Sequence, residues 1–233
     1  MGKTFVLLHG AWHGGWCWAE VAEILRARGH RVTTPTQTGL GERRHLISRD
    51  VTVETFIDDL ANHILAEDLR DVTLVGHSFG GMATSGTAER MPERLSEVVY
   101  LDCTMVRGGE CMADNLPAST VTERIRAAKA SDGVSVPPPP VSVFGVTEPE
   151  VAARLQARLT PHPLNTMLTP LPITGLPGNG LPARYIRAAD PAYHTRERVE
   201  GWCAEFGFTL QEIAACHDAM VTAPKALADL LET

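Results

Sequence analysis

The chain has 233 residues and an ordinary globular composition, with 44% hydrophobic and 21% charged residues. This length suits one large domain or two small ones, with enough chain to bury a sizeable core. The formal net charge of −7 argues against a nucleic acid or an anionic membrane as partner, because both attract clustered positive charge. We therefore expect no nucleic-acid partner and no membrane partner.

The five cysteines are odd in number and form no CxxC pair, which favours reduced thiols over a disulfide framework or a zinc site. The first apolar run, Phe5 to Leu8, is too short for a signal peptide. No run of about 20 apolar residues could span a bilayer. These features predict a cytoplasmic protein without a metal, and they leave a homodimer open.

Short apolar runs alternate with segments of helical periodicity over the first hundred residues and again near the C-terminus. Buried parallel strands and amphipathic helices produce these two patterns. The predicted strands are 3–8, 31–34, 72–75, 95–102, 183–187 and 208–213, and the predicted helices are 18–28, 53–67, 79–90, 195–205 and 219–231. This alternation predicts an α/β fold, with a mostly parallel sheet and helices on both faces.

The alternation stops between Thr104 and Pro182. All but three of the 16 prolines lie in the span from Pro117 to Pro191, and only two helices are predicted before the strands resume, near 121–129 and 149–159. We interpret residues 104–182 as an inserted cap, and residues 1–103 and 183–233 as the core. Open α/β sheets bind ligands at the carboxyl ends of their strands, so we expect the cap to lie there.

Residues 76–80, Gly-His-Ser-Phe-Gly, form a G-x-S-x-G motif between a predicted strand and a predicted helix. A sharp turn at this place exposes the Ser78 hydroxyl, and the helix N-terminus adds positive partial charge where an oxyanion would form. A glycine-rich turn with a capping serine is the plainer interpretation, but the strand before it and the helix after it favour a nucleophile. The oxyanion hole is then predicted from the N–H groups of Phe79 and of Ala11, in the turn after the first strand.

Chain order predicts that the base of such a site is a histidine near the C-terminus, and His217 fits. Two acids follow predicted strands, Asp102 and Asp190. Asp190 also fits a helix N-cap followed by Pro191 as the first helical residue, whereas Asp102 has no such structural explanation. We favour Asp102 and keep Asp190 open. Asp218, directly after His217, is expected to be too constrained to orient that ring.

A substrate pocket is expected between the turn after the first strand and the cap. Most apolar cap residues merely pack against their neighbours, so only some of the candidates would reach it. The candidates are Trp12, Met105, Phe144, Leu164, Met167 and Leu168. Arg43 and Arg44 could meet an anionic substrate, but solvated loop charges are the simpler interpretation.

Residues 9–16 (HGAWHGGW), 76–81 (GHSFGG) and 217–220 (HDAM) resemble the α/β-hydrolase superfamily, and within it the plant methylesterases, hydroxynitrile lyases and their bacterial esterase relatives. The resemblance spans nearly the whole chain and is weaker in the cap. It implies an α/β-hydrolase fold and a serine esterase acting on a small-molecule carboxylic ester, with Ser78 as nucleophile and His217 as base and with no cofactor.

The same resemblance bears on the acid and on the reaction. The plant members carry their acid in the loop that here holds Asp190, which keeps that residue open. The lyases carry a threonine and a lysine where this chain has Gly10 and Asp218. This difference favours ester hydrolysis, and a lyase, or cleavage of a carbon–carbon or amide bond, remains the alternative.

Overall fold

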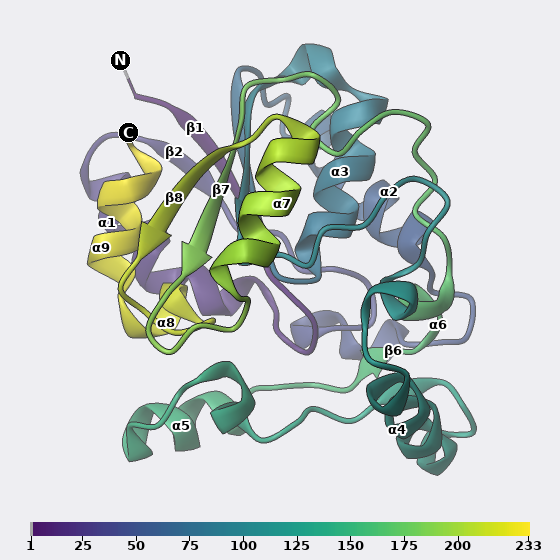
Figure 1. The fold of residues 1–233 in the computed structure, drawn as a ribbon. Helices are drawn as coiled ribbons and strands as arrows, with labels where there is room; N and C mark the ends of the chain where they lie inside the picture. Colours follow the sequence, from purple (N-terminus) through teal and green to yellow (C-terminus); the bar gives the residue numbers. More distant parts are fainter. Residues whose placement is uncertain (1) are drawn as a thin grey trace.

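A six-stranded sheet forms the centre of the computed structural model, which describes residues 2–233 (Figure 1). In spatial order its strands are β2 (Arg31–Thr33), β1 (Thr4–Leu8), β3 (Val72–His77), β4 (Leu95–Leu101), β7 (Ala183–Ala188) and β8 (Thr209–Ile213). Every neighbouring pair in this sheet is parallel. The predicted α/β fold class is confirmed.

Helices cover both faces of the sheet, which explains why the residues of its central strands are mostly apolar. In β1, Phe5 and Leu7 belong to one hydrophobic cluster, and Val6 and Leu8 belong to another. The first face is covered by α1 (Ala19–Ala27) and α9 (Pro224–Leu231), and the second by α2 (Val53–Ala66), α3 (Gly80–Arg90) and α7 (Arg196–Phe206). Within residues 2–233, no helix has both the length and the apolar character needed to cross a membrane.

One predicted helix and one possible helix start differ from the structure. The single helix predicted over 219–231 is in fact α8 (Ala219–Thr222) followed by α9, because Pro224 lacks the N–H that would continue the helical ladder and instead begins the second helix. The interpretation of Asp190 as a helix N-cap is wrong. Helix α7 begins at Arg196, and its N-cap is Thr195, whose hydroxyl accepts the N–H of Arg198.

The residues between β4 and β7 lie outside the main sheet. They contain α4 (Ala118–Ala128), α5 (Pro149–Gln156), α6 (Asn165–Leu168) and the antiparallel pair β5 (Ser135–Val136) and β6 (His162–Pro163). In Figure 1 the arrowheads of β7 and β8 point toward the layer that holds α4 and α5. This layer therefore lies beyond the carboxyl ends of the strands.

Trp12, in the turn after β1, links the sheet to this layer. Its indole Nε1–H donates to the carbonyl oxygen of Val136 at 3.1 Å, and its own carbonyl oxygen accepts the N–H of Thr160 at 2.9 Å. Trp12 adopts a φ of +65°, a left-handed conformation that is uncommon for a residue with a side chain. The two hydrogen bonds join the segment between β4 and β7 to the turn that follows β1.

Candidate active site

Ser78 follows the last residue of β3 and precedes α3, and its backbone is held in a left-handed turn. Its φ is +51°, and its N–H donates to the carbonyl oxygen of Leu101 at 3.0 Å. Two glycines make the turn sterically possible. A Cβ on Gly76 would lie 2.3 Å from the Thr84 hydroxyl oxygen, and a Cβ on Gly80 would lie 2.6 Å from the carbonyl oxygen of His9. The motif thus presents the hydroxyl at the end of a central strand.

A continuous chain of hydrogen bonds joins Ser78, His217 and Asp102. The Ser78 hydroxyl lies 2.9 Å from His217 Nε2, and His217 Nδ1 lies 2.7 Å from Asp102 Oδ2. The other carboxylate oxygen of Asp102 accepts the N–H of Ala188 at 3.2 Å. Asp102 is fully buried, and His217 is nearly so. With Asp102 ionised, Nδ1 carries the ring proton and Nε2 is free to accept the proton of the serine hydroxyl.

Asp190, the alternative acid, lies apart from this chain. Its side chain is exposed, and its backbone N–H donates to the carbonyl oxygen of Ala215 at 3.1 Å. Within residues 2–233, its carboxylate makes no hydrogen bond to His217. Of the two acids that the sequence left open, the structure brings only Asp102 to the histidine.

The backbone N–H groups of Ala11 and Phe79 are both available at the same place. Both residues line the cavity that contains Ser78. Among the described residues, neither N–H donates to a protein acceptor, which is unusual for buried amides. Two free N–H groups beside a serine hydroxyl can stabilise an oxyanion.

The His217 ring is fixed by its neighbours as well as by Asp102. Tyr193 stacks on it with ring centroids 4.0 Å apart, and Phe144 stacks at 5.8 Å. His77 Nε2 lies 3.0 Å from the carbonyl oxygen of His217 and donates to it. Burial holds the pKa of His77 well below its usual value, so this side chain is a neutral donor. It anchors the backbone of His217.

Asp218 contacts the turn after β1 instead of the His217 ring. Its Oδ2 lies 3.2 Å from His13 Nε2, and His13 Nδ1 donates to the carbonyl oxygen of Ala11 at 2.8 Å. Burial alone would lower the pKa of His13, but the Asp218 carboxylate outweighs this effect and raises it. With an acceptor at each ring nitrogen, His13 has the surroundings of an imidazolium. This pair ties the segment after His217 to the peptide of Ala11.

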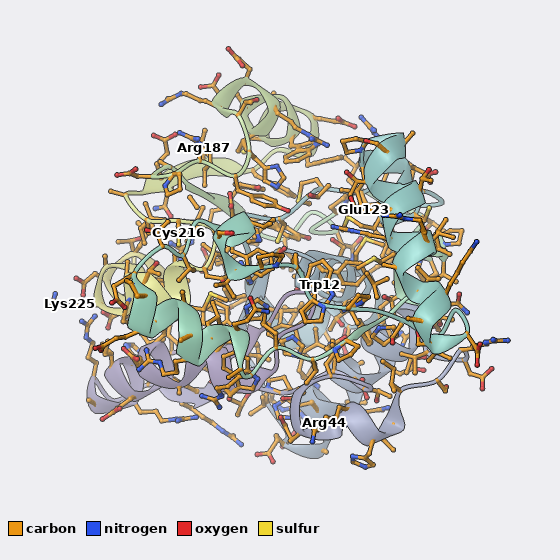
Figure 2. The ribbon with its side chains drawn as sticks, turned by 90° about the horizontal axis from the view of Figure 1, so that it is seen from below. Trp12, Arg44, Glu123, Arg187, Cys216 and Lys225 are labelled. Carbon is orange, nitrogen blue, oxygen red and sulfur yellow. The ribbon has the colours of Figure 1, made fainter. Side chains whose placement is uncertain are left out.

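The cavity beside Ser78 is small, with a volume of about 30 Å³. Of the predicted pocket residues, Trp12, Phe144 and Met167 line it. Met105 is buried but does not reach it. Leu164 and Leu168 instead line a small neighbouring hollow. In Figure 2, Trp12 lies near the middle of the face seen from the cap side, while Arg44 lies at its edge.

Several cavity residues were not expected from the sequence. Tyr193 and Thr104 lie in loops that follow sheet strands, and nothing in their local pattern marks them. Arg124 belongs to a predicted cap helix whose charges resemble an ordinary solvated face. The remaining unexpected lining residues are His13, His77, Met112 and Leu116. His77 and His13 are neighbours in sequence of Ser78 and Ala11, whereas contacts between distant segments place the others at the site.

One group of side chains has the composition of a metal site. Ligand atoms of His77, His217 and Asp218 all lie within 4.8 Å of one another. Each residue is already engaged, because His217 contacts Ser78, Asp218 contacts His13, and His77 donates to a backbone carbonyl. Hydrogen bonds therefore account for this arrangement.

The sequence model of the Alpha/beta hydrolase family matches residues 5–230 of this chain. The chain belongs to the Alpha/beta hydrolase family. This hydrolase is 36% identical to the carbendazim hydrolyzing esterase of Nocardioides sp. (strain SG-4G), over 98% of each chain. It is 39% identical to Methylesterase 1 of Arabidopsis thaliana over 106 residues, which are 44% of this chain and 40% of that protein. The expected resemblance to plant methylesterases and a bacterial esterase is confirmed.

Solved structures give the same result for the fold. An extracellular α/β-hydrolase from a Paenibacillus species superposes with a TM-score of 0.83 at 26% identity, covering 98% of this chain and 97% of the other. The methylesterase MES16 from Arabidopsis superposes with a TM-score of 0.78 at 23% identity, covering 99% and 97%. The fold is that of an α/β hydrolase, and the names of the relatives support an esterase.

Proposed function

We propose that this hydrolase cleaves a small-molecule carboxylic ester through an acyl-enzyme formed on Ser78. The observation that carries the proposal is the chain of hydrogen bonds from the Ser78 hydroxyl through His217 to buried Asp102. It lies at a cavity with two free backbone N–H groups. Esterase names among the relatives support the same reaction class.

In the first half of the reaction, His217 Nε2 takes the proton of the Ser78 hydroxyl as its oxygen attacks the ester carbonyl carbon. The N–H groups of Ala11 and Phe79 stabilise the negative charge on the carbonyl oxygen. Loss of one such donor costs other enzymes about 2.7–4 kcal/mol of transition-state stabilisation. The protonated histidine then gives its proton to the alcohol, which leaves, and the acyl group stays on Ser78.

In the second half, water attacks the acyl-enzyme. His217 accepts a proton from the water and returns it to the Ser78 oxygen as the carboxylic acid leaves. Asp102 stabilises the imidazolium formed in both halves and holds Nδ1 in the required tautomer. Atoms balance as ester plus water giving acid plus alcohol, and this sequence of steps uses only side chains and backbone groups of the chain.

The test is turnover of 4-nitrophenyl acetate and of a panel of methyl, aryl and thio esters by wild type and Ser78→Ala. The panel includes carbendazim, because the 36% identical relative is named for hydrolysing it. We expect Ser78→Ala to lose turnover by several orders of magnitude while keeping its circular dichroism spectrum. A fluorophosphonate probe should label wild type at Ser78 and leave the variant unlabelled. Hydrolysis retained by Ser78→Ala would overturn the proposal.

The alternative lyase reaction is separated in the same series. Release of cyanide from mandelonitrile, with no hydrolysis of any ester, would replace ester cleavage by lyase chemistry. Lysine at the position after the histidine is a lyase feature, and here that position holds Asp218, paired with His13. We therefore expect ester hydrolysis without cyanide release.

A further inference from the structure

Arg124 is the only arginine or lysine among the described residues that line the cavity containing Ser78. It lies on α4 of the cap, and its side chain is half-buried. Its guanidinium carbon lies 5.3 Å from the ring centroid of Trp12, and its Nη1 lies 3.6 Å from the sulfur of Met167. Both of these neighbours also line the cavity, so the guanidinium is directed inward over apolar surface.

No carboxylate neutralises this guanidinium. Within residues 2–233, no acidic oxygen lies within the 4.0 Å that would make an ion pair with Arg124, and the adjacent Glu123 side chain is exposed. Burial lowers the pKa of Arg124, which expresses the cost of removing its charge from water, and the charge of Glu123, which lines the outer hollow, offsets this only in part. An unpaired and partly desolvated guanidinium beside a reactive serine is an arrangement that needs an explanation.

Two arginines that are buried more deeply, Arg184 and Arg187, differ in this respect. Arg184 Nε lies 2.7 Å from an oxygen of Glu97, and Arg187 donates to Glu212 at the same distance. Both belong to β7, and Figure 2 places Arg187 well away from Trp12. At these two buried guanidinium groups the fold provides a carboxylate within ion-pair distance. At Arg124, no carboxylate of residues 2–233 lies within that distance.

Arg124 also lines two neighbouring hollows. The cavity beside Ser78 and an outer hollow of about 420 Å³ share Trp12, Arg124, Phe144 and Tyr193 as lining residues. The outer hollow is bounded by α4 and by the proline run 137–140. A ligand with its ester carbonyl at Ser78 can therefore extend past Trp12 toward the guanidinium.

We propose that Arg124 is a specificity-determining residue that binds a carboxylate carried by the substrate, so that the preferred substrates are monoesters of dicarboxylic acids. The inference rests on the proposed esterase function and adds the substrate class. A guanidinium forms two parallel N–H···O bonds to a carboxylate, and that pair is stronger and more directional than a neutral hydrogen bond. The substrate would supply the counter-charge that the fold leaves out.

The experiment compares monomethyl with dimethyl esters of dicarboxylic acids from succinate to suberate. The members of each pair differ by one carboxylate. The number of methylene groups in the diacid sets the distance between the ester and the carboxylate, which can be matched to the separation of Ser78 and Arg124. In wild type we expect kcat/KM to favour the monoester at one or two lengths. Added NaCl should raise KM for those monoesters, because salt screens the attraction.

Three variants test whether Arg124 causes the preference for monoesters. Arg124→Met should lower the monoester-to-diester ratio of kcat/KM about 10- to 100-fold, mainly through KM, since a hydrogen bond to a charged group is lost. Arg124→Lys should keep part of the ratio, because it retains the charge without the planar fork. Arg126→Met is the matched control, because Arg126 is an exposed arginine of the same helix, and it should leave the ratio as in wild type.

The outcomes separate this inference from the function on which it rests. If wild type turns over diesters and Arg124→Met lowers both ester series equally, Arg124 only packs the cap and the inference is overturned. If wild type turns over no ester, the proposed function fails instead. Calorimetric binding of the preferred monoester to Ser78→Ala, with and without Arg124→Met, covers the case of an unstable variant. Equal affinity in the two proteins would also overturn the inference.

Discussion

A carboxylate can orient a histidine ring only from within hydrogen-bond distance, and this separates Asp102 from Asp190. Asp102 follows β4, the strand beside the one that carries Ser78, and reaches His217 Nδ1 at 2.7 Å. Its φ of +48° turns the chain sharply at the end of the strand. Asp190 follows β7 and is exposed. The neighbouring strand thus supplies the acid next to the nucleophile.

We predict that Asp102→Asn lowers kcat for 4-nitrophenyl acetate by about 10³- to 10⁴-fold, because the amide allows the wrong histidine tautomer. Asp190→Asn should remain within about twofold of wild type, since an exposed side chain without a partner gives little to the transition state. Steady-state kinetics of the two variants, with circular dichroism to check folding, measures the difference. The reverse order of effects would place the acid in the loop after β7.

Local sequence could not decide between these two acids. Both follow predicted strands, and the helix start that seemed to explain Asp190 does not exist, because α7 begins at Arg196. The pairing of Asp218 with His13 joins residues far apart in the chain. By contrast, the surroundings of Ser78 were predictable, because the strand, the turn and the helix that shape it are consecutive.

At the scale of secondary-structure elements, two helical glycines look alike in sequence but differ in their packing. Gly86 lies in α3 against α2, and a Cβ there would meet the Cδ1 of Ile57 at 2.2 Å. Gly201 lies in α7, and nothing would come within 4 Å of its Cβ. The first glycine permits close helix packing, whereas the second only adds flexibility.

We predict opposite effects of alanine on the free energy of unfolding. Gly86→Ala should destabilise by about 1–3 kcal/mol through overpacking, and Gly201→Ala should stabilise by about 0.5–1 kcal/mol through helix propensity. Urea denaturation at neutral pH measures both. In the background of Ile57→Ala the cost of Gly86→Ala should shrink. A stabilising Gly86→Ala in wild type would contradict the packing described here.

The core elements and the two longer cap helices, α4 and α5, were predictable, whereas the contacts of the cap were not, for a physical reason. In the core, hydrophobic periodicity follows from burial on one or two faces of each element, so that β1 and α2 can be recognised locally. In the cap, positions depend on contacts such as the hydrogen bond from Trp12 to Val136, which lies 124 residues further on. Phe144 and Met167 line the cavity, whereas Met105 does not, and the local sequence of these residues does not distinguish them.

On the scale of the whole molecule, four buried histidines resist protonation. Burial lowers the pKa of His9 and of His194 from the usual 6.5 to about 4. Burial also holds the pKa of His77 and of His162 well below the usual value. The opposite shift at His13 concerns one side chain. The folded protein therefore binds fewer protons than the unfolded chain below pH 6.5.

We predict that stability falls as pH decreases from about 6.5 to 4. Above pH 6.5 these four histidines are neutral in both states and contribute nothing. Below pH 6.5 the unfolded chain binds protons at these histidines and the folded protein does not. The free energy of unfolding therefore falls by up to roughly 1.4 kcal/mol per pH unit for each histidine. The raised pKa of His13 acts at higher pH, where its stabilising effect is lost as pH rises above 6.5.

Urea midpoints measured at pH 7.5, 6.5, 5.5 and 4.5 test this prediction. His162→Gln should make the urea midpoint depend less on pH below 6.5, because it removes one histidine whose pKa is lowered by folding. His45→Gln is the matched control, since His45 is exposed and stays in water on unfolding. A slope that does not depend on His162, or stability that is constant down to pH 4.5, would contradict the prediction.

The contact between His13 and Asp218 spans 205 positions of the chain. During synthesis His13 leaves the ribosome 205 residues before Asp218, so its imidazole has no Asp218 carboxylate beside it until that later segment has emerged. His217, the proposed base, and Asp218 then arrive together as adjacent residues. The proposed base and the carboxylate that contacts His13 therefore become available at the same stage of synthesis. The proposed catalytic activity therefore requires that synthesis has passed Asp218.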